Sequence, residues 1–105
     1  MIVAFEKQYL CDLYEKGKSN NKKHRFPPQI IEKYKERIDT LKKANRIEDL
    51  FPIAALNYEV LQGSKKGISS IRVNLQYRIE FTVEINEKET YLTICNIQEL
   101  TNHYK

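Results

Sequence analysis

The sequence predicts an α+β fold in which two N-terminal helices pack on one face of a small antiparallel sheet. Apolar residues recur at helical spacing in the N-terminal part of the chain, up to about Asn45. From about Tyr58 onward apolar and polar residues alternate, and glycines lie between the alternating segments as turn residues. With 105 residues the chain can bury one modest core but not two, so we expect a single domain over residues 1–105.

The N-terminal part is expected to contain one strand and two helices. Residues 2–5, Ile-Val-Ala-Phe, are typical of a short strand, and the apolar spacing that follows predicts a helix that ends near Lys16. The proline pair at 27–28 is typical of a helix N-terminus, and this second helix extends to about Asn45. Its expected buried stripe consists of Ile30, Tyr34, Ile38 and Leu41. A short helical piece is expected at about 47–50.

The C-terminal part is expected to form the sheet. Its alternation predicts four strands, at about 58–62, 68–74, 76–85 and 90–97. Turns are expected between Gly63 and Gly67 and over residues 86–89. A short connection pairs the second and third of these strands antiparallel, so Arg72 and Arg78 are expected side by side on an exposed polar face.

Composition excludes several classes of protein. No apolar run approaches the roughly 18 residues of a membrane span, and the N-terminus lacks the regions of a signal peptide, so we expect a soluble cytoplasmic protein. Cys11 and Cys95 belong to no paired motif and are expected to be reduced, with a disulfide between them as the alternative. No cluster of metal ligands and no phosphate-binding loop is present, so we expect no metal and no other cofactor.

Positive charge is concentrated in the N-terminal part of the chain. Residues 1–46 carry 12 basic and 6 acidic side chains, whereas residues 47–105 carry 6 basic and 8 acidic ones. The densest basic segment, 16–25, is expected to be an exposed loop between the two helices. Its alternatives are a solvated connector and a phosphate-binding segment of a nucleic-acid site. The candidate nucleic-acid contacts are Lys22, Lys23 and Arg25, and His24 between them is expected to be solvated.

The segment 58–79 resembles the central region of the RelE/ParE toxin superfamily and is most similar to its HigB-type and YoeB-type members. A turn with the residues Lys-Lys-Gly at 65–67 precedes a strand that reads Ser-Ile-Arg-Val-Asn, and Tyr77 and Arg78 then open the next strand. The opening Met-Ile-Val-Ala-Phe is also similar. The resemblance implies a RelE-like, microbial-ribonuclease-type fold and the toxin of a bacterial type II toxin–antitoxin pair.

The resemblance also implies a metal-free ribonuclease that cleaves messenger RNA on the ribosome. Such cleavage uses the ribose 2′-hydroxyl as nucleophile and needs a base, a cation for the phosphoryl oxygens and an acid. Glu59 matches the base-like glutamate of YoeB-type toxins, and Arg78 is the candidate cation. Alternatively, Glu59 is an ordinary surface residue and Arg78 pairs across strands with Glu80 or Glu84. The side chains expected to position the RNA backbone are Lys65, Lys66 and Arg72.

The C-terminus carries the candidate general acid. His103 and Tyr104 resemble the terminal His-Tyr pair of YoeB-type toxins, in which histidine supplies the acid and tyrosine a stacking ring. Here the chain also departs from its relatives. Many HigB-type toxins have Asp-Tyr-His at the end of the last strand, whereas residues 95–99 of this chain read Cys-Asn-Ile-Gln-Glu. The acid function is therefore assigned to His103, with a frayed terminus as the alternative.

The function that the resemblance implies is a HigB-like, ribosome-dependent mRNA endoribonuclease that inhibits translation in the cytoplasm. Its expected partners are the ribosome, mRNA and a helix-turn-helix antitoxin of the HigA type. Two alternatives stay open because fold alone does not decide function. One is a ParE-like toxin that poisons DNA gyrase without nuclease activity. The other is a small RNA-binding module without catalysis.

Overall fold

The computed structural model of the chain describes residues 1–20, 22–86 and 92–102. In these ranges the helices are α1 (Gln8–Lys16) and α2 (Pro28–Lys43), and the strands are β1 (Ile2–Phe5), β2 (Glu59–Val60), β3 (Ser69–Arg72), β4 (Tyr77–Asn86) and β5 (Leu92–Asn102). The connections contain the 3₁₀ helices η1 (Lys22–His24), η2 (Ile47–Leu50), η3 (Ala54–Leu56) and η4 (Gly63–Lys65). The first strand, both helices and the helical piece at 47–50 confirm the predictions.

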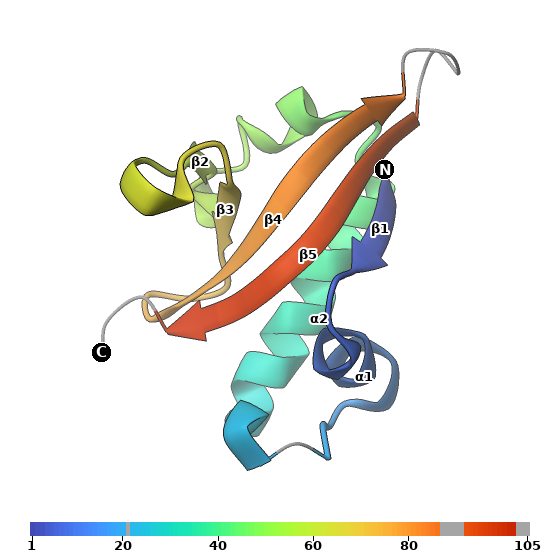
Figure 1. The fold of residues 1–105 in the computed structure, drawn as a ribbon, viewed down its shortest axis with the longest axis vertical. Helices are drawn as coiled ribbons and strands as arrows, with labels where there is room; N and C mark the ends of the chain where they lie inside the picture. The colour runs from blue at the N-terminus through green and yellow to red at the C-terminus, as the bar shows by residue number, and fades with distance from the viewer. Residues whose placement is uncertain (21, 87–91, 103–105) are drawn as a thin grey trace.

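The strands form one sheet with the order β1-β5-β4-β3-β2 (Figure 1). β2, β3, β4 and β5 pair antiparallel, as predicted, whereas β1 lies parallel to β5 at one edge. Residue Arg72 pairs directly with Arg78, so the predicted register between the two strands is confirmed. Strands β1 and β5 are more than 80 residues apart in the chain, and no local pattern predicts that they pair.

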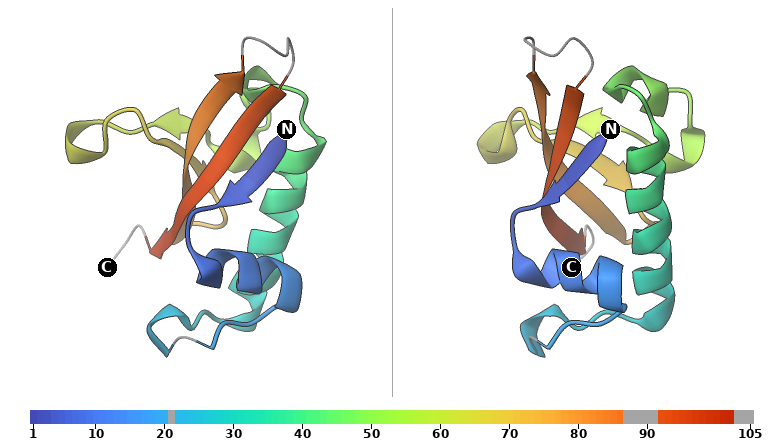
Figure 2. Two further views of the ribbon diagram at one scale, coloured as in Figure 1. Left: turned by 45° about the vertical axis from the view of Figure 1, so that its right-hand side comes forward. Right: turned by 90° about the vertical axis from the view of Figure 1, so that its right-hand side faces the viewer.

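The helix α2 lies along one face of the sheet, and α1 lies beside it below the end of β1 (Figure 2). The predicted stripe of α2 is confirmed, because Ile30, Tyr34, Ile38 and Leu41 are all buried. They pack against the apolar face of the strands, where Ile71, Ile79, Phe81 and Ile97 are fully buried. The Tyr34 hydroxyl also donates a hydrogen bond of 2.7 Å to the Leu10 carbonyl, which ties α2 to α1.

The last strand is longer than predicted. β5 continues to Asn102, five residues beyond the predicted end, because its pairing with β4 resumes after an irregularity at Glu80 and Phe81. Phe81 pairs with Ile97 and Glu80 pairs with Glu99, so β5 has one extra residue at this point, which is a β-bulge. Of the turn predicted at 86–89, only the first residue lies among the described residues.

Cys11 and Cys95 are both free thiols, and Cys95 is buried beside the Met1 sulfur, so the disulfide alternative is wrong for this structure. Burial raises the pKa of the Cys95 thiol to about 11, which keeps it protonated at neutral pH.

In the described ranges, no helix combines the length and apolarity that crossing a membrane requires.

Candidate functional site

One face of the sheet carries charged residues from four strands. Directly opposite residues of antiparallel strands project to the same face, so the register places Glu59, Ser70, Glu80 and Glu99 in one row across the sheet. A neighbouring row contains Arg72, Arg78 and Thr101. We call the side of the sheet formed by these seven residues the polar face. It carries a line of carboxylates next to a pair of arginines.

Arg78 is buried at the centre of this face, with only 5% of its surface exposed. Its Nε donates to the Ser70 hydroxyl at 2.6 Å, and its Nη2 donates to the Asn57 carbonyl at 3.0 Å. The same Nη2 lies 3.2 Å from a carboxylate oxygen of Glu59. The expectation of an exposed polar face is therefore wrong at this residue. A buried guanidinium needs such partners because it stays charged.

The segment that leads into β2 supplies two of these partners. Asn57 ends η3 in the left-handed conformation, with φ 43° and ψ 54°, which asparagine tolerates better than most residues. In this conformation the Asn57 carbonyl accepts the hydrogen bond from Arg78. Strand β2 begins two residues later, at Glu59. The predicted strand 58–62 is shortened to two residues, because only Glu59 and Val60 pair with β3.

Glu59 and Arg78, the predicted base and cation, therefore lie in direct contact. The Glu59 side chain is about half exposed, so its carboxylate lies at the boundary between the buried arginine and solvent. Among the described residues, the ion pair of Arg78 is with Glu59, and the alternative partners Glu80 and Glu84 are not used. The arrangement combines a fixed cation with a solvent-accessible proton acceptor.

A second ion pair lies next to the first one on the polar face. Lys65 donates to both carboxylate oxygens of Glu80, at 3.1 and 3.0 Å, and the Glu80 side chain is only 9% exposed. Lys65 comes from η4, and the left-handed glycines Gly63 (φ 72°) and Gly67 (φ 88°) turn this segment back over the sheet. Glu80 was not predicted as a site residue. The available signal was its position two residues after Arg78, on the same strand face.

A third charged group gathers around Glu99 in the same row. Glu99 accepts hydrogen bonds from Lys7 and from the Tyr9 hydroxyl, the latter at 2.8 Å. Burial by itself raises the pKa of Glu99, but the bonds from Lys7 and Tyr9 and the charges of Lys7 and His24 outweigh it and lower that pKa. Burial, and then the bond to Glu99, raise the pKa of the Tyr9 hydroxyl, which stays protonated.

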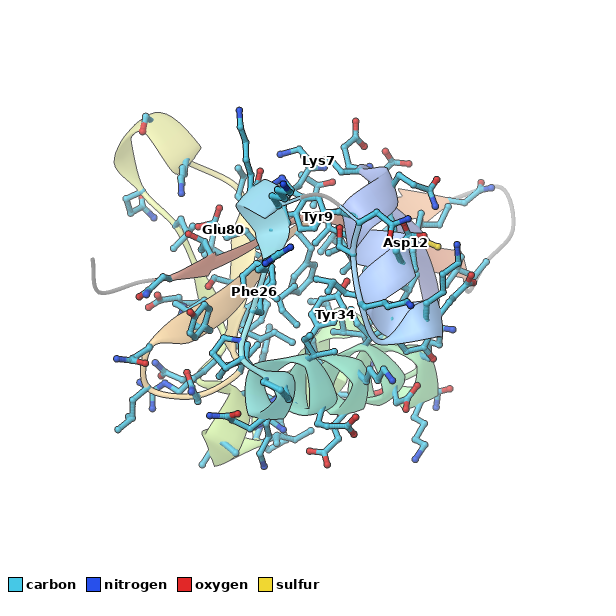
Figure 3. All side chains as sticks on the ribbon, turned by 90° about the horizontal axis from the view of Figure 1, so that it is seen from below. Lys7, Tyr9, Asp12, Phe26, Tyr34 and Glu80 are labelled. Atoms are coloured by element: carbon cyan, nitrogen blue, oxygen red, sulfur yellow. The ribbon has the colours of Figure 1, made fainter. Side chains whose placement is uncertain are left out.

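His24 lies in this third group, and the expectation that it is solvated is wrong. Its ring stacks flat on the Tyr9 ring, with centroids 3.6 Å apart and planes within 3°. Figure 3 shows Tyr9 and Lys7 on the side of α1 that faces the strands, with Glu80 beyond them. No local pattern predicts this group, because Tyr9 and Glu99 are 90 residues apart.

The other predicted RNA contacts lie at different places. Arg72 is half buried beside Arg78, and Lys66 is exposed next to Lys65. The cations Lys22, Lys23 and Arg25 are exposed on and beside η1. The candidate acid and stacking residues, His103 and Tyr104, lie outside the described residues. In the described part of the chain, no three His, Cys, Asp or Glu side chains come together as a metal site requires.

The sheet order and the two helices define a small α+β fold that also occurs in solved toxin structures. A YoeB/ParE toxin from Agrobacterium tumefaciens has this fold, with a TM-score of 0.60 and 21% identity over 99% of this chain and 100% of that one. A YoeB-YefM complex from Staphylococcus aureus contains a chain with a TM-score of 0.57 and 24% identity, over 99% of this chain and 98% of that one. These structural likenesses establish the fold.

Sequence comparisons establish the family. Residues 3–94 match the model of the HigB-like toxins, described as the RelE-like toxin of the type II toxin-antitoxin system HigB. Toxin HigB-1 of Vibrio cholerae serotype O1 is 37% identical over 82 residues, which are 77% of this chain and 82% of that protein. An uncharacterized protein of Haemophilus influenzae is 31% identical over 79% of each chain. The chain belongs to the HigB-like family of RelE-like toxins of type II toxin–antitoxin systems.

Proposed function

We propose that the chain is a ribosome-dependent mRNA endoribonuclease without a metal, and that residues 1–105 form one toxin domain. The observation that carries this proposal is the contact between Glu59 and Arg78. A proton acceptor that is open to solvent lies 3.2 Å from a buried guanidinium on one face of the sheet. A module that only bound RNA would need the cation but not a carboxylate beside it, because a carboxylate repels phosphate.

In the proposed reaction the ribose 2′-hydroxyl attacks the adjacent phosphorus atom. Glu59 accepts the hydroxyl proton, the new O–P bond closes a 2′,3′-cyclic phosphate, and the bond from phosphorus to the 5′-oxygen breaks. Arg78 stabilises the charge on the phosphoryl oxygens, with its orientation set by Ser70 and the Asn57 carbonyl. A guanidinium has five N–H groups, and the hydrogen bonds to Ser70 and Asn57 take two of them.

The leaving 5′-oxygen needs a proton, and we assign this step to His103. The residue follows Asn102, whose pairing partner Tyr77 directly precedes Arg78 in β4. An imidazole titrates near pH 6.5 and therefore suits a general acid at neutral pH. Tyr104 supplies a ring for stacking, and Lys65, Lys66, Arg72 and the cations near η1 contact RNA phosphates.

The proposed partners follow from the family and the site. The substrate is mRNA on the ribosome, which places the protein in the cytoplasm and makes translation the inhibited process. As a toxin of a type II system, the chain binds an antitoxin, and the solved complex of YoeB with YefM supports such a pairing. We propose a helix-turn-helix antitoxin of the HigA type.

The proposal is tested by inducing wild-type protein, Arg78→Ala and Arg46→Ala in a bacterial host and mapping mRNA 5′ ends within translated frames. Arg46 is a matched control, because it is an exposed arginine whose ion pairs are with Glu48 and Asp49. We expect new in-frame ends and growth arrest with the wild type and Arg46→Ala, and neither with Arg78→Ala. The loss of one transition-state donor typically lowers the rate about 10²- to 10³-fold.

DNA supercoiling is measured in the same cultures, because it separates the two toxin classes. Growth arrest with altered supercoiling and no mRNA ends would discard the ribonuclease and favour the gyrase-poisoning alternative. If Arg78→Ala cleaved mRNA as well as the wild type, Arg78 would not belong to the catalytic site, but the protein would still be a ribonuclease.

A further inference from the structure

The proposed reaction does not use the parallel stack of the Tyr9 and His24 rings. Tyr9 is only 6% exposed, and its hydroxyl is held by Glu99, which Lys7 also binds. His24 is half buried and lies on the outer side of this anchored ring. A histidine in a basic loop thus stacks on a tyrosine that is buried and hydrogen-bonded.

The surroundings of the stack are hollowed on two sides. A hollow of about 380 Å³ is lined by Lys7, Gln8, Tyr9, Asp12, Ser19, Asn20 and His24. A second hollow of about 250 Å³ is lined by Leu13, Lys18, Ser19, His24, Arg25, Phe26 and Ile31. His24 is one of the two residues that contact both hollows. The first volume lies near the lower end of the roughly 300–1,000 Å³ of small-molecule sites, and the second lies just below that range.

The chemistry of the two hollows fits one nucleotide of a single-stranded RNA. Base stacking on an aromatic ring combined with cations for the backbone is the usual way in which proteins bind single strands. The second hollow joins the His24 ring to the apolar side chains of Phe26 and Ile31, with Lys18 and Arg25 beside them. The first hollow adds Lys7.

The stack also lies within reach of the candidate cleavage site. Glu99 is directly opposite Glu80 on the neighbouring strand, in the row next to Arg78. Adjacent strands are about 4.8 Å apart, so an RNA strand that crosses the polar face from Arg78 approaches Glu99 and the stack within a few nucleotides.

We propose that the Tyr9–His24 stack binds an unpaired nucleobase of the RNA that the polar face contacts, with His24 as the stacking ring. This inference rests on the proposed ribonuclease function for the identity of the bound RNA. It assigns a binding role to His24 and an indirect, positioning role to Tyr9 and Glu99. Any nucleobase can stack on an aromatic ring. The site therefore strengthens RNA binding and fixes the position of the strand, but it selects little between bases.

The test uses purified protein without ribosomes and short single-stranded RNAs that carry one 2-aminopurine, placed at successive positions. The fluorescence of 2-aminopurine falls when the base stacks on a ring. We expect quenching at one position with the wild type and with His24→Phe, which retains an aromatic plane. His24→Ala should lose this quenching and bind roughly 5- to 100-fold more weakly. Thermal unfolding of each variant verifies that the fold is retained.

Lys22→Ala provides a charge control on the same loop. It should weaken binding at low salt but leave the quenching at saturation unchanged, because Lys22 belongs to η1 and lines neither hollow. Quenching that is equal in the wild type and His24→Ala would overturn the inference, as would a His24→Phe variant that behaves like His24→Ala.

Arg78→Ala separates this inference from the proposed function. Quenching by Arg78→Ala protein would support the stacking site whatever the result of the cleavage experiment. If mRNA cleavage occurs in cells but no RNA position is quenched by the wild type, the stacking site is wrong and the ribonuclease stands.

Discussion

The cations of this protein occupy two different environments, the sheet and the loop between the helices. Arg78 is buried on the polar face and held by a hydroxyl, a carbonyl and a carboxylate. Lys22, Lys23 and Arg25 are exposed on and beside η1. A fixed cation can stabilise charge at one point in a transition state, whereas exposed cations supply general attraction for RNA. The comparison separates residues expected to affect the rate of cleavage from residues expected to affect binding.

The largest effect is expected from Glu59→Gln, which tests the sheet side of this comparison. The amide keeps the size of the side chain but accepts no proton, so cleavage of ribosome-bound mRNA should slow by roughly 10²- to 10⁴-fold. The measurement is single-turnover cleavage with purified ribosomes. The matched control is Glu36→Gln, an exposed carboxylate of α2 that pairs with Lys33. An unchanged rate for Glu59→Gln would remove Glu59 from the mechanism.

A charge-conserving substitution compares the two environments directly. Arg78→Lys retains the charge but loses the planar donors that bind Ser70 and the Asn57 carbonyl, so cleavage should fall by about 10²-fold. Arg25→Lys keeps the charge of an exposed loop residue and should change the rate by less than about threefold. If both variants cleaved mRNA equally well, the difference between a buried and an exposed cation would not affect the rate of cleavage.

A smaller effect on stability is expected at the second ion pair. Lys65→Met leaves the nearly buried Glu80 carboxylate without its bidentate partner, which should lower the free energy of unfolding by about 1–2 kcal/mol. Since Lys65 itself is about half exposed, the loss stays below that of a fully buried pair. Urea unfolding measures it, and Lys66→Met is the control. Glu80→Gln in the Lys65→Met background should restore part of the loss, and no restoration would contradict this explanation.

The smallest effect is expected in the pH dependence of stability. The pKa of Glu99 is lowered in the folded protein, so its contribution to stability is present above the unfolded value and disappears as pH falls through the folded value. Tyr9→Phe removes one hydrogen bond to this carboxylate, so the variant should lose more stability at pH 7 than at pH 3.

Urea unfolding at both pH values measures this difference, with Tyr58→Phe as the control. The Tyr58 hydroxyl bonds to the Ser69 hydroxyl instead of a carboxylate, so its effect should not depend on pH. If Tyr9→Phe lowered the free energy of unfolding equally at pH 7 and pH 3, the hydrogen bond from Tyr9 would not lower the pKa of Glu99.

Local patterns predicted much of the fold. The helix α2 was recognised because its buried stripe repeats with the helical period, and all four residues of the stripe are buried. The pairing of Arg72 with Arg78 was recognised because a short connection joins β3 and β4 and leaves few possible registers. These features depend on residues that are near each other in the chain.

The candidate site was predicted only in part. The resemblance pointed to Glu59 and Arg78, which the structure places in contact. It did not reveal the pairing of Lys65 with Glu80, nor the group formed by Lys7, Tyr9 and Glu99. The interpretation of His24 as solvated failed because its partner, Tyr9, is on a different element. Each missed contact joins residues whose proximity depends on how the elements pack.

By itself, the sequence determined the helices, the strand alternation, the polarity of the two sheet faces and the resemblance to RelE/ParE toxins. These properties follow from side-chain periodicity and from residue order within short segments. Only the tertiary structure decided that β1 pairs with β5, that Arg78 is buried against Asn57 and Glu59, and that Tyr9 supports His24. The physical reason is that burial and ion pairing depend on which surfaces meet, and distant segments meet only when the whole chain folds around one core.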